Sequence, residues 1–415
     1  MLRRALMGSG FSLAVIVGLA GGCVVSSSET DKSSSRSSQG EADQSGANGQ
    51  KTSTCVKATE VKNTIGGDSL IPRDINEKGH VAGTASIGGE GVHGFLWDGR
   101  TLVDLKTLGG RDSDALALNE DGWVVGYSAP EGGLTSSRAT LWRNGEAIDL
   151  GTLGGDFSIA GDVNNGGQIV GNSLTTEGET HAFVWENGAM RDLGTLPGHN
   201  ASVALDINDR GDILGTSRVS GELERHVVLW KDGAMTDLGV GRGDLNERGD
   251  ILFGSGDSAW LVRGGARMPI TPFGDATATF LHNDPLSNAG HVIGTARRPD
   301  GSIAPFLWQD GTTTRVGDVD QLNPLSVNRQ GEVVGHVGEF GVARAFSWKA
   351  GELTYLASAD VHTIALGIND AGLIMGQLEG GASMMLWQTH PCEGTPPKKD
   401  AGGPSTDDGG GGKTW

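Results

Sequence analysis

The chain has 415 residues, of which 70 are glycine, and a formal net charge of −19 at pH 7. Such an acidic body repels phosphate backbones and anionic membrane surfaces, which excludes nucleic acid as a partner. The glycines recur at fixed places along the chain, so they indicate turns and not low-complexity filler.

Residues 1–22 have the features of a bacterial export signal. Arg3 and Arg4 precede an apolar stretch over 11–19, which is too short for a stable membrane span. Removal of this segment with its two arginines takes the formal charge from −19 to −21.

The sequence Leu19-Ala20-Gly21-Gly22-Cys23 resembles the lipobox of bacterial lipoproteins, a family in which the cysteine is lipidated and becomes the first residue. The resemblance implies lipidation at Cys23, although Ala20 stands where the family prefers leucine. Val24 follows in place of aspartate, and by the family's sorting pattern this implies the outer membrane, with the protein facing the periplasm or the exterior. Ordinary cleavage near Gly22, with Cys23 incidental, is the alternative.

Two segments have the composition of disordered chain. Residues 23–54 are mostly small and polar with no apolar periodicity, so they cannot offset the entropy of ordering and are expected to be a flexible tether. Residues 393–415, with Pro-Pro-Lys-Lys and a run of four glycines, are expected to be a disordered tail. The folded domain is therefore predicted over residues 55–392.

That domain contains a repeated Asn-x-x-Gly element followed by an apolar pair and a second glycine. It occurs in eight copies, at 75–83, 118–126, 163–171, 207–215, 245–254, 286–294, 327–335 and 368–376. Asparagine opening a turn and glycine closing it in a left-handed conformation predict a tight hairpin with a glycine bulge. The sixth copy has Ser287 at the asparagine position.

A second element is an apolar run ending in tryptophan, followed in most copies by Asp-Gly or Asn-Gly, as in Phe183-Val184-Trp185-Glu186-Asn187-Gly188. The pair predicts another hairpin, and the strand after it carries Asp-Leu-Gly, as at 192–194. Four short strands per unit, repeating every 39 to 45 residues, predict an all-β fold, the β-propeller. Eight four-stranded blades follow from the count, or seven if the weak fifth unit (245–272) is an insertion.

The last unit stops after its third strand, and the missing strand is predicted near the N-terminus. We expect residues 56–61 to complete the last blade, and Cys55 and Cys392, at the two ends of that sheet, to form a disulfide in an oxidising compartment. Two unpaired thiols are the alternative. Splitting one unit between the chain ends favours a closed ring over an open solenoid.

From about residue 64 to 387 the chain also resembles the extracellular HAF-repeat proteins, named for a tripeptide found here at His181-Ala182-Phe183. The motif Asp-Leu-Gly-Thr-Leu-Gly-Gly at 149–155 is shared as well. The match is specific in the second to fourth copies and eroded from the fifth onward. Membership implies a secreted repeat protein and no agreed activity.

The order of turns predicts two unlike faces. The Asn-x-x-Gly and Asp-Gly turns fall on one rim, and the loops between second and third strands, which vary in length and composition, fall on the other. Acids recur in those loops at Glu90, Glu131, Glu177, Glu179, Glu222, Glu224, Asp300 and Glu339. They predict either an acidic rim for a cationic partner or a divalent ion, or simply the solvated loops of an acidic protein.

Signals for catalysis are weak. A glycoside hydrolase needs paired carboxylates and a lyase needs a Lys, Arg or Tyr base, but the acids recur with the repeat and the only tyrosines are Tyr127 and Tyr355. The aspartate of Asp-Leu-Gly is interpreted as a structural acceptor and the histidines as packing residues. No metal-ligand spacing occurs, and no cofactor is expected.

These observations predict a lipid-anchored, monomeric, non-enzymatic propeller that binds a protein or glycan through its variable rim. The only expected membrane contact is the lipid. A polysaccharide hydrolase or lyase with its site in the central channel is the alternative, and a structural protein that coats the cell is a third possibility.

Overall fold

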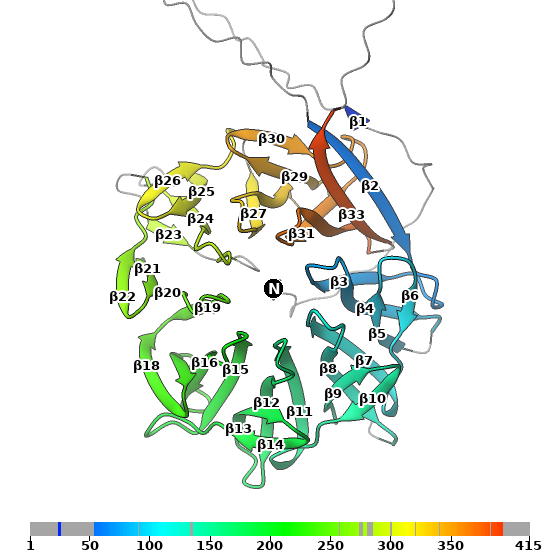
Figure 1. The fold of residues 1–415 in the computed structure, drawn as a ribbon, viewed down its shortest axis with the longest axis vertical. Coiled ribbons are helices and arrows are strands. Elements are labelled where there is room, and N and C mark those ends of the chain that lie inside the picture. Colours follow the sequence, from blue (N-terminus) through cyan, green and yellow to red (C-terminus); the bar gives the residue numbers. More distant parts are fainter. Residues whose placement is uncertain are drawn as a thin grey trace, which may run out of the picture.

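The computed structural model describes residues 24–25, 54–89, 91–132, 136–256, 258–273, 277–279, 285–298, 301–319, 321–339, 341–381 and 383–392. The regular structure of these residues is β-strand, and they contain no helix long and apolar enough to cross a membrane. Eight antiparallel sheets stand around a central axis as the blades of a ring (Figure 1). The predicted eight-bladed β-propeller is confirmed.

Seven blades are meanders of four strands paired in chain order, with the first strand nearest the axis (Figure 1). Blades 1 to 4 are β3 (Leu70–Ile75), β4 (Val81–Ile87), β5 (Gly91–Trp97), β6 (Leu102–Asp104); β7 (Gly109–Leu118), β8 (Val124–Pro130), β9 (Arg138–Arg143), β10 (Glu146–Asp149); β11 (Gly154–Val163), β12 (Ile169–Thr175), β13 (Thr180–Glu186), β14 (Ala189–Asp192); and β15 (Ala201–Ile207), β16 (Ile213–Arg218), β17 (His226–Lys231), β18 (Ala234–Val240). Blades 5 to 7 are β19 (Arg242–Leu245), β20 (Ile251–Ser255), β21 (Ser258–Arg263), β22 (Ala266–Pro269); β23 (Thr277–Thr279), β24 (Val292–Arg297), β25 (Ile303–Gln309), β26 (Thr312–Arg315); and β27 (Leu322–Val327), β28 (Val333–Val337), β29 (Arg344–Lys349), β30 (Glu352–Tyr355).

Blade 8 joins the two ends of the chain, as predicted. Its inner strands are β31 (Thr363–Ile368), β32 (Leu373–Leu378) and β33 (Ser383–Pro391), and its outer strand is β2 (Thr54–Lys62), which pairs antiparallel with β33 along its whole length. A disulfide joins Cys55 to Cys392, with 4.9 Å between the Cα atoms. The chain is therefore closed into a circle by a strand ladder and one covalent bond.

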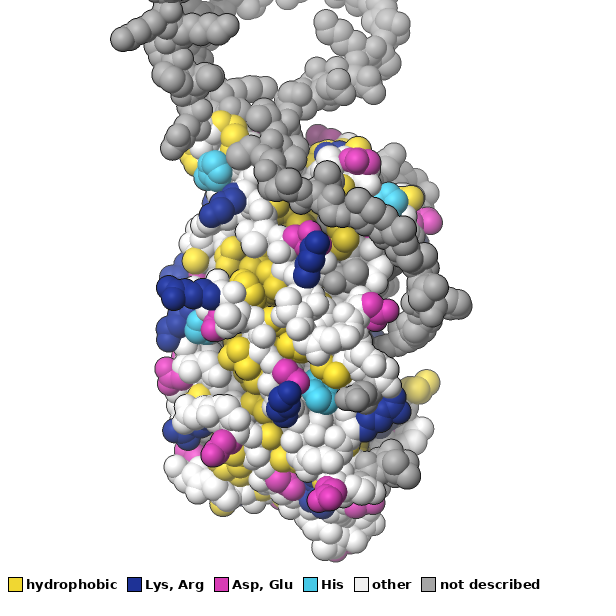
Figure 2. All heavy atoms as spheres, turned by 90° about the vertical axis from the view of Figure 1, so that its right-hand side faces the viewer, with side chains coloured by type: hydrophobic (Ala, Val, Ile, Leu, Met, Phe, Trp, Pro, Cys, Tyr) yellow, Lys and Arg dark blue, Asp and Glu magenta, His cyan; other side chains and the backbone are white. Residues whose placement is uncertain are grey.

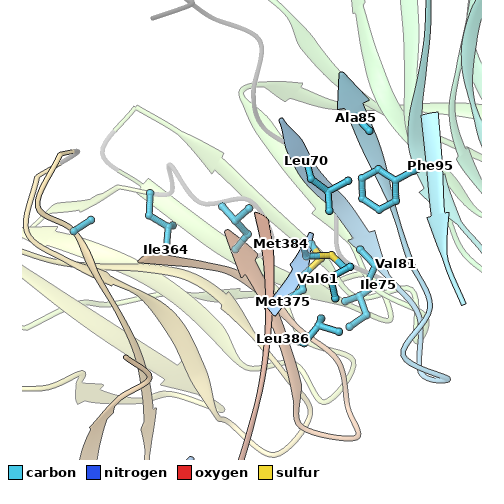
Figure 3. Close-up of a cluster of buried hydrophobic side chains, with 12 residues drawn as sticks. Val61, Leu70, Ile75, Val81, Ala85, Phe95, Ile364, Met375, Met384 and Leu386 are labelled. Carbon is cyan, nitrogen blue, oxygen red and sulfur yellow. The ribbon is translucent and has the colours of Figure 1, made fainter. Parts of the chain in front are cut away.

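The core lies between neighbouring blades, and the closure has a core of its own. Val61 of β2 packs with Met384 of blade 8 and with Leu70 of blade 1, and all three are buried (Figure 3). Burial of one such side chain stabilises the fold by about 1.5–3 kcal/mol. The N-terminal strand thus contributes both ladder hydrogen bonds and apolar contacts across the seam.

Blade 5 forms a blade of its own, so the alternative of seven blades is wrong. Its tryptophan, however, stands out of register. In blade 3 Trp185 pairs with Ile169, the first residue of the second strand, but in blade 5 Val262 takes the equivalent place opposite Ile251. Trp260 stands two residues earlier and stacks on a phenylalanine of the same blade, with 5.7 Å between ring centroids.

The outer wall of the ring carries short edge strands. Figure 2 shows this wall on the side of blades 1 and 2, where hydrophobic side chains are interspersed with charged side chains of both signs. The outer strands β6 and β10 have three and four residues, whereas β2 has nine and exposes Lys57 and Lys62. Short or lysine-bearing edges resist pairing with further chains.

Several predictions concern residues that the structure does not describe, namely the signal over 1–22, Cys23 and the tail over 393–415. Of the predicted tether, the described residues include Thr54, with which β2 begins, and a two-residue strand, β1 (Val24–Val25). This strand pairs with Val56 and Cys55 of β2. The closing sheet therefore has five strands in the order β1-β2-β33-β32-β31.

Candidate functional site

The Asn-x-x-Gly turns are the predicted hairpins. In blade 3 Gly167 has a φ of 79°, a left-handed conformation that favours glycine, and its N–H donates to the Asn164 carbonyl. The Oδ1 of Asn164 accepts the N–H of Gln168 at 2.9 Å. The side-chain amide nitrogen donates one hydrogen to Gln168 Oε1 at 2.9 Å and has a second to donate elsewhere.

That nitrogen donates to the next blade, and the bond repeats around the axis. Asn164 Nδ2 lies 3.0 Å from the carbonyl oxygen of Asn208. Equivalent bonds run from Asn76 to Asn119, Asn119 to Asn164, Asn208 to Asn246, Asn246 to Ser287, and Asn328 to Asn369. Asn369 Nδ2 lies 2.9 Å from the Asn76 carbonyl oxygen, which joins the last blade to the first. Because these asparagines are buried, each missing amide would remove one of the two donors of a buried carbonyl, the other being the glycine N–H of its own turn.

In blade 6, where serine replaces the asparagine, a histidine supplies the link. The imidazole of His291 lies 3.2 Å from the Ser287 hydroxyl and makes a hydrogen bond to the backbone of Asn328 in blade 7. Burial lowers the pKa of His291, which favours the neutral imidazole. The sixth copy has therefore lost the asparagine but keeps a hydrogen bond to the next blade.

A second ring is formed by the residue that follows each asparagine. The backbone N–H of Glu77 donates to Glu120 Oε1 at 2.9 Å, and the N–H of Asp370 donates to Glu77 Oε1 at 3.0 Å, again across the closure. The position is Asp, Asn or Glu in seven of the eight copies. In blade 7 it is Arg329, which pairs with Asp370 at 2.8 Å.

This second ring surrounds the axis at the tight-turn face. It lines a polar cavity of about 400 Å³ made by Glu77, Glu120, Asn165, Asp209, Glu247, Asn288, Ala289, Arg329 and Asp370. Both carboxyl oxygens of Glu77 accept backbone N–H groups, and Asp370 accepts the Arg329 N–H with one oxygen and forms an ion pair with the Arg329 guanidinium through the other. The acids of this face therefore link the blades. These acids were not among the predicted site residues, although their recurrence beside the asparagine was a usable signal.

The acids predicted for the binding rim lie elsewhere, in the loops between second and third strands. Glu131 lies in blade 2, Glu177 and Glu179 in blade 3, Glu222 and Glu224 in blade 4, and Glu339 in blade 7, whereas Glu90 and Asp300 lie outside the described residues. The described acids are spread over four blades, two each on blades 3 and 4 and one each on blades 2 and 7. Among the residues that the structure describes, no group of three or more His, Cys, Asp or Glu side chains is arranged to hold a metal ion.

Two of these acids contact the histidines of the repeat. His181 Nδ1 lies 2.8 Å from Asp192 and its Nε2 lies 3.7 Å from Glu179. His226 is placed in the same way between Asp237 and Glu224, at 2.9 and 3.9 Å. The histidines, interpreted from sequence as packing residues, therefore bind the aspartates of the fourth strand.

The aspartates of Asp-Leu-Gly are acceptors, as interpreted from the sequence. Asp237 Oδ1 accepts the N–H of Gly239 at 2.8 Å. Burial opposes ionisation of Asp237, but the hydrogen bonds from Gly239 and His226 outweigh it and lower its pKa. This carboxylate holds the turn that leads to the next blade.

One buried polar cluster is singular and bears on the hydrolase or lyase alternative. Asp114 of blade 2 lies 3.2 Å from Arg73 of blade 1, accepts a hydrogen bond from Thr84, and lies 3.5 Å from the Tyr127 hydroxyl. Burial raises the pKa of Asp114 even though Arg73 opposes the shift. Burial and Asp114 also raise the pKa of Tyr127, which keeps the phenol protonated and unsuited to act as a base. The cluster ties blade 1 to blade 2.

Trp123, which is not one of the repeat tryptophans, is half-buried and contacts two neighbours. The Arg143 guanidinium lies 4.2 Å from its ring centroid, and the turn at Gly167 of blade 3 packs against its six-membered ring. The ring therefore lies between blades 2 and 3. The face that the Arg143 guanidinium covers is not open for a sugar to stack on.

No family model matches the chain, and no curated protein sequence matches it. Among solved structures, the chain is similar to the β-propeller domain of the Trilobed protease from Pyrococcus furiosus, with 12% identity, a TM-score of 0.44, and coverage of 72% of this chain and 98% of that one. It is also similar to the computationally designed Ika8 protein, with 16% identity, a TM-score of 0.45, and coverage of 78% and 97%.

TolB from Acinetobacter baumannii is a further similar structure, with 13% identity, a TM-score of 0.35, and coverage of 79% of this chain and 67% of that one. At these identities the likeness concerns the fold alone. The strand order and the closure by β2 establish the propeller independently of it.

Proposed function

We propose that the protein is a non-enzymatic binding module, lipid-anchored through Cys23 at the outer membrane, whose loop rim holds a protein or glycan partner. The observation that supports this is the contrast between the two faces. On the tight-turn face the asparagines and acids are engaged in interblade hydrogen bonds, whereas the loops between second and third strands differ in every blade.

The loops vary on a constant frame. Blade 2 uses residues 131–137 between its second and third strands and blade 3 uses 176–179, while blade 5 crosses from Ser255 to Ser258 with two residues. Leu223, in the loop of blade 4, is 93% exposed. Divergent loops on a rigid scaffold are the usual site of binding in such folds.

Blade 5 supplies the means to test the rim. Replacing residues 131–137 and 176–179 with the two-residue connector Gly-Asp of blade 5 should leave the ring folded, because the chain already closes a blade this way. The variant and the parent protein are compared for capture of partners from envelope fractions and on a glycan array. We expect partners to be lost with the loops, at an unchanged unfolding temperature.

Retention of every partner after all long loops are replaced would overturn the proposal that the rim binds. Release of reducing ends from cell-wall or capsular polysaccharide by the purified protein would overturn the non-enzymatic assignment. The anchor is tested separately by incorporation of radiolabelled palmitate. We expect labelling of the wild type and none in the Cys23→Ser variant, and equal labelling would contradict lipidation at that residue.

A further inference from the structure

The junction between blades 6 and 7 departs from the repeat on both faces of the ring. On the tight-turn face Arg329 stands where other blades offer an acceptor oxygen, and a guanidinium has none to offer the Asn288 N–H. On the loop rim two of the most exposed large hydrophobic side chains flank the same junction. Ile303 of blade 6 is 57% exposed and Val342 of blade 7 is 63% exposed.

Strand alternation shows which way the residues of blade 6 point. Phe306 and Trp308 pack with blade 5, whereas Leu307 packs with the core shared with blade 7. Ile303 and Leu307 are four residues apart on the same strand, so their side chains lie on the same face of the sheet, toward blade 7. Arg297 pairs with Ile303 across the strands, so its side chain lies on that face as well. Arg297 is exposed.

On blade 7 the histidine and aspartate of other blades are replaced by Arg344 and Tyr355. The Arg344 guanidinium lies 3.8 Å from the Tyr355 ring centroid, and its Nε donates to the Ala357 carbonyl at 2.8 Å. Arg344 is two residues from Phe346 on the same strand, so both side chains lie on the face toward blade 6, where Phe346 packs in the shared core. Among the described residues neither Arg297 nor Arg344 makes an ion pair, in contrast to Arg263 and Arg329.

We propose that this junction surface, formed by Arg297, Ile303, Val342, Arg344 and Tyr355, binds an acidic polypeptide segment that carries apolar side chains; this rests on the proposed function of the rim. Arginine and tyrosine beside exposed aliphatic side chains form the composition of an interface hot spot. The two guanidinium groups, which make no ion pair with a described residue although Asp360 acts electrostatically on Arg344, favour carboxylates on the partner. An acidic glycan supplies carboxylates but no aliphatic or aromatic side chains to cover Ile303 and Val342.

The test uses the full chain in detergent and, as the probe, a fluorescently labelled random copolymer of glutamate and tyrosine. Polyglutamate and polygalacturonate are the comparison ligands. We expect the copolymer to bind at least about tenfold more tightly than either, because only it offers both charge and apolar surface. Ile303→Ser combined with Val342→Ser should weaken binding about tenfold, and Arg297→Ser should weaken it and reduce its salt dependence.

Val103→Ser is the matched control, because Val103 is an exposed aliphatic residue on the outer strand β6 of blade 1, outside the rim loops. Its affinity should stay within about twofold of the wild type, a difference smaller than one interface side chain produces. Absence of copolymer binding, equal binding of polygalacturonate, or an equal loss in the control would each overturn the assignment. Suppose that replacing the loops of blades 2 and 3 abolishes copolymer binding, while the Ile303 and Val342 double variant binds as tightly as the wild type. The rim would then still be the binding surface, and only its assignment to the junction between blades 6 and 7 would be overturned.

Discussion

The tight-turn face and the loop rim are made by hairpins of the same blades, but they differ in what each hairpin binds. On the tight-turn face Asn164 spans from blade 3 to blade 4, and its counterparts do the same around the circle. On the rim some turns close within their own loops, as where the Gly178 N–H donates to the Thr175 carbonyl, and the bonds between blades do not recur from copy to copy, as where Glu379 of blade 8 accepts the Gly341 N–H of blade 7.

This difference accounts for which parts of the sequence repeat. A residue whose partner lies in the next blade must match the geometry of that blade, so asparagine and its acidic neighbour recur in copy after copy. A loop whose bonds are internal can change without disturbing the ring. Repetition within the chain therefore marks interblade coupling, and variation marks the surface that is free to bind.

The largest effect is expected from opening the circle on which the interblade coupling depends. Replacing both Cys55 and Cys392 with serine should lower the free energy of unfolding by about 2–5 kcal/mol, since the disulfide closes a loop of most of the chain. Urea unfolding followed by tryptophan fluorescence measures the loss. Cys23→Ser is the control, and a double variant as stable as this control would show that strand pairing alone closes the ring.

The next effect separates the two faces directly. Asn164→Ala removes the bond to Asn208 and the acceptor for Gln168, both at a buried site, and should cost about 2–4 kcal/mol. Asn164→Asp keeps the acceptor but sets an oxygen against the Asn208 carbonyl, so it should be similarly destabilising. Chemical unfolding of the two variants gives both values.

Asn187→Asp is the matched control for this pair. Asn187 is an exposed turn residue with a left-handed backbone, at a position where blades 4 and 6 already have aspartate with the same conformation, at Asp232 and Asp310. Its unfolding free energy should change by less than about 0.5 kcal/mol. If Asn187→Asp lowered the free energy of unfolding as much as Asn164→Asp, the hydrogen bonds from the asparagine amides to the next blade would have no special part in stability.

The fold could be predicted because it is determined by short turn motifs, and the number of their copies in the sequence gives the number of blades. Asn-x-x-Gly and Asn-Gly fix hairpins by turn chemistry, and the missing fourth strand of the last unit pointed to residues 56–61. The partner of the asparagine amide could not be predicted, because a turn motif does not say which carbonyl lies one blade away. The pairing of Arg344 with Tyr355 was hidden for the same reason, since neither residue follows the repeat.

The rim was the least predictable part. Its acids share a loop type but no period, so the sequence placed them in the same kind of loop and could not say whether they meet. The tight-turn acids do have a period, beside each asparagine from Glu77 to Asp370, and they were overlooked because they lie within a motif already explained as a turn.

A smaller effect tests the fourth-strand aspartates that lead toward the loop rim. The pKa of Asp237 is lowered in the folded protein, so its contribution to stability is present above the unfolded value near pH 3.9 and is lost as the pH falls through the folded value. Since its side chain is 42% exposed, Asp237→Asn should cost only a few tenths of a kcal/mol at pH 7. Urea titrations at pH 7 and pH 3 should show this difference shrinking in acid, and a difference that grew would contradict the assigned direction.

The smallest effect is expected on the loop rim itself. Glu131→Ala and Glu222→Ala change exposed side chains that make no hydrogen bond to another blade in the described structure, so each should shift the free energy of unfolding by less than about 0.5 kcal/mol. Thermal unfolding of the two variants beside Asn164→Ala measures the contrast on one scale. A loss comparable to that of the asparagine variant would mean that the loops share in coupling the blades, and their variation could then no longer be attributed to freedom from the ring.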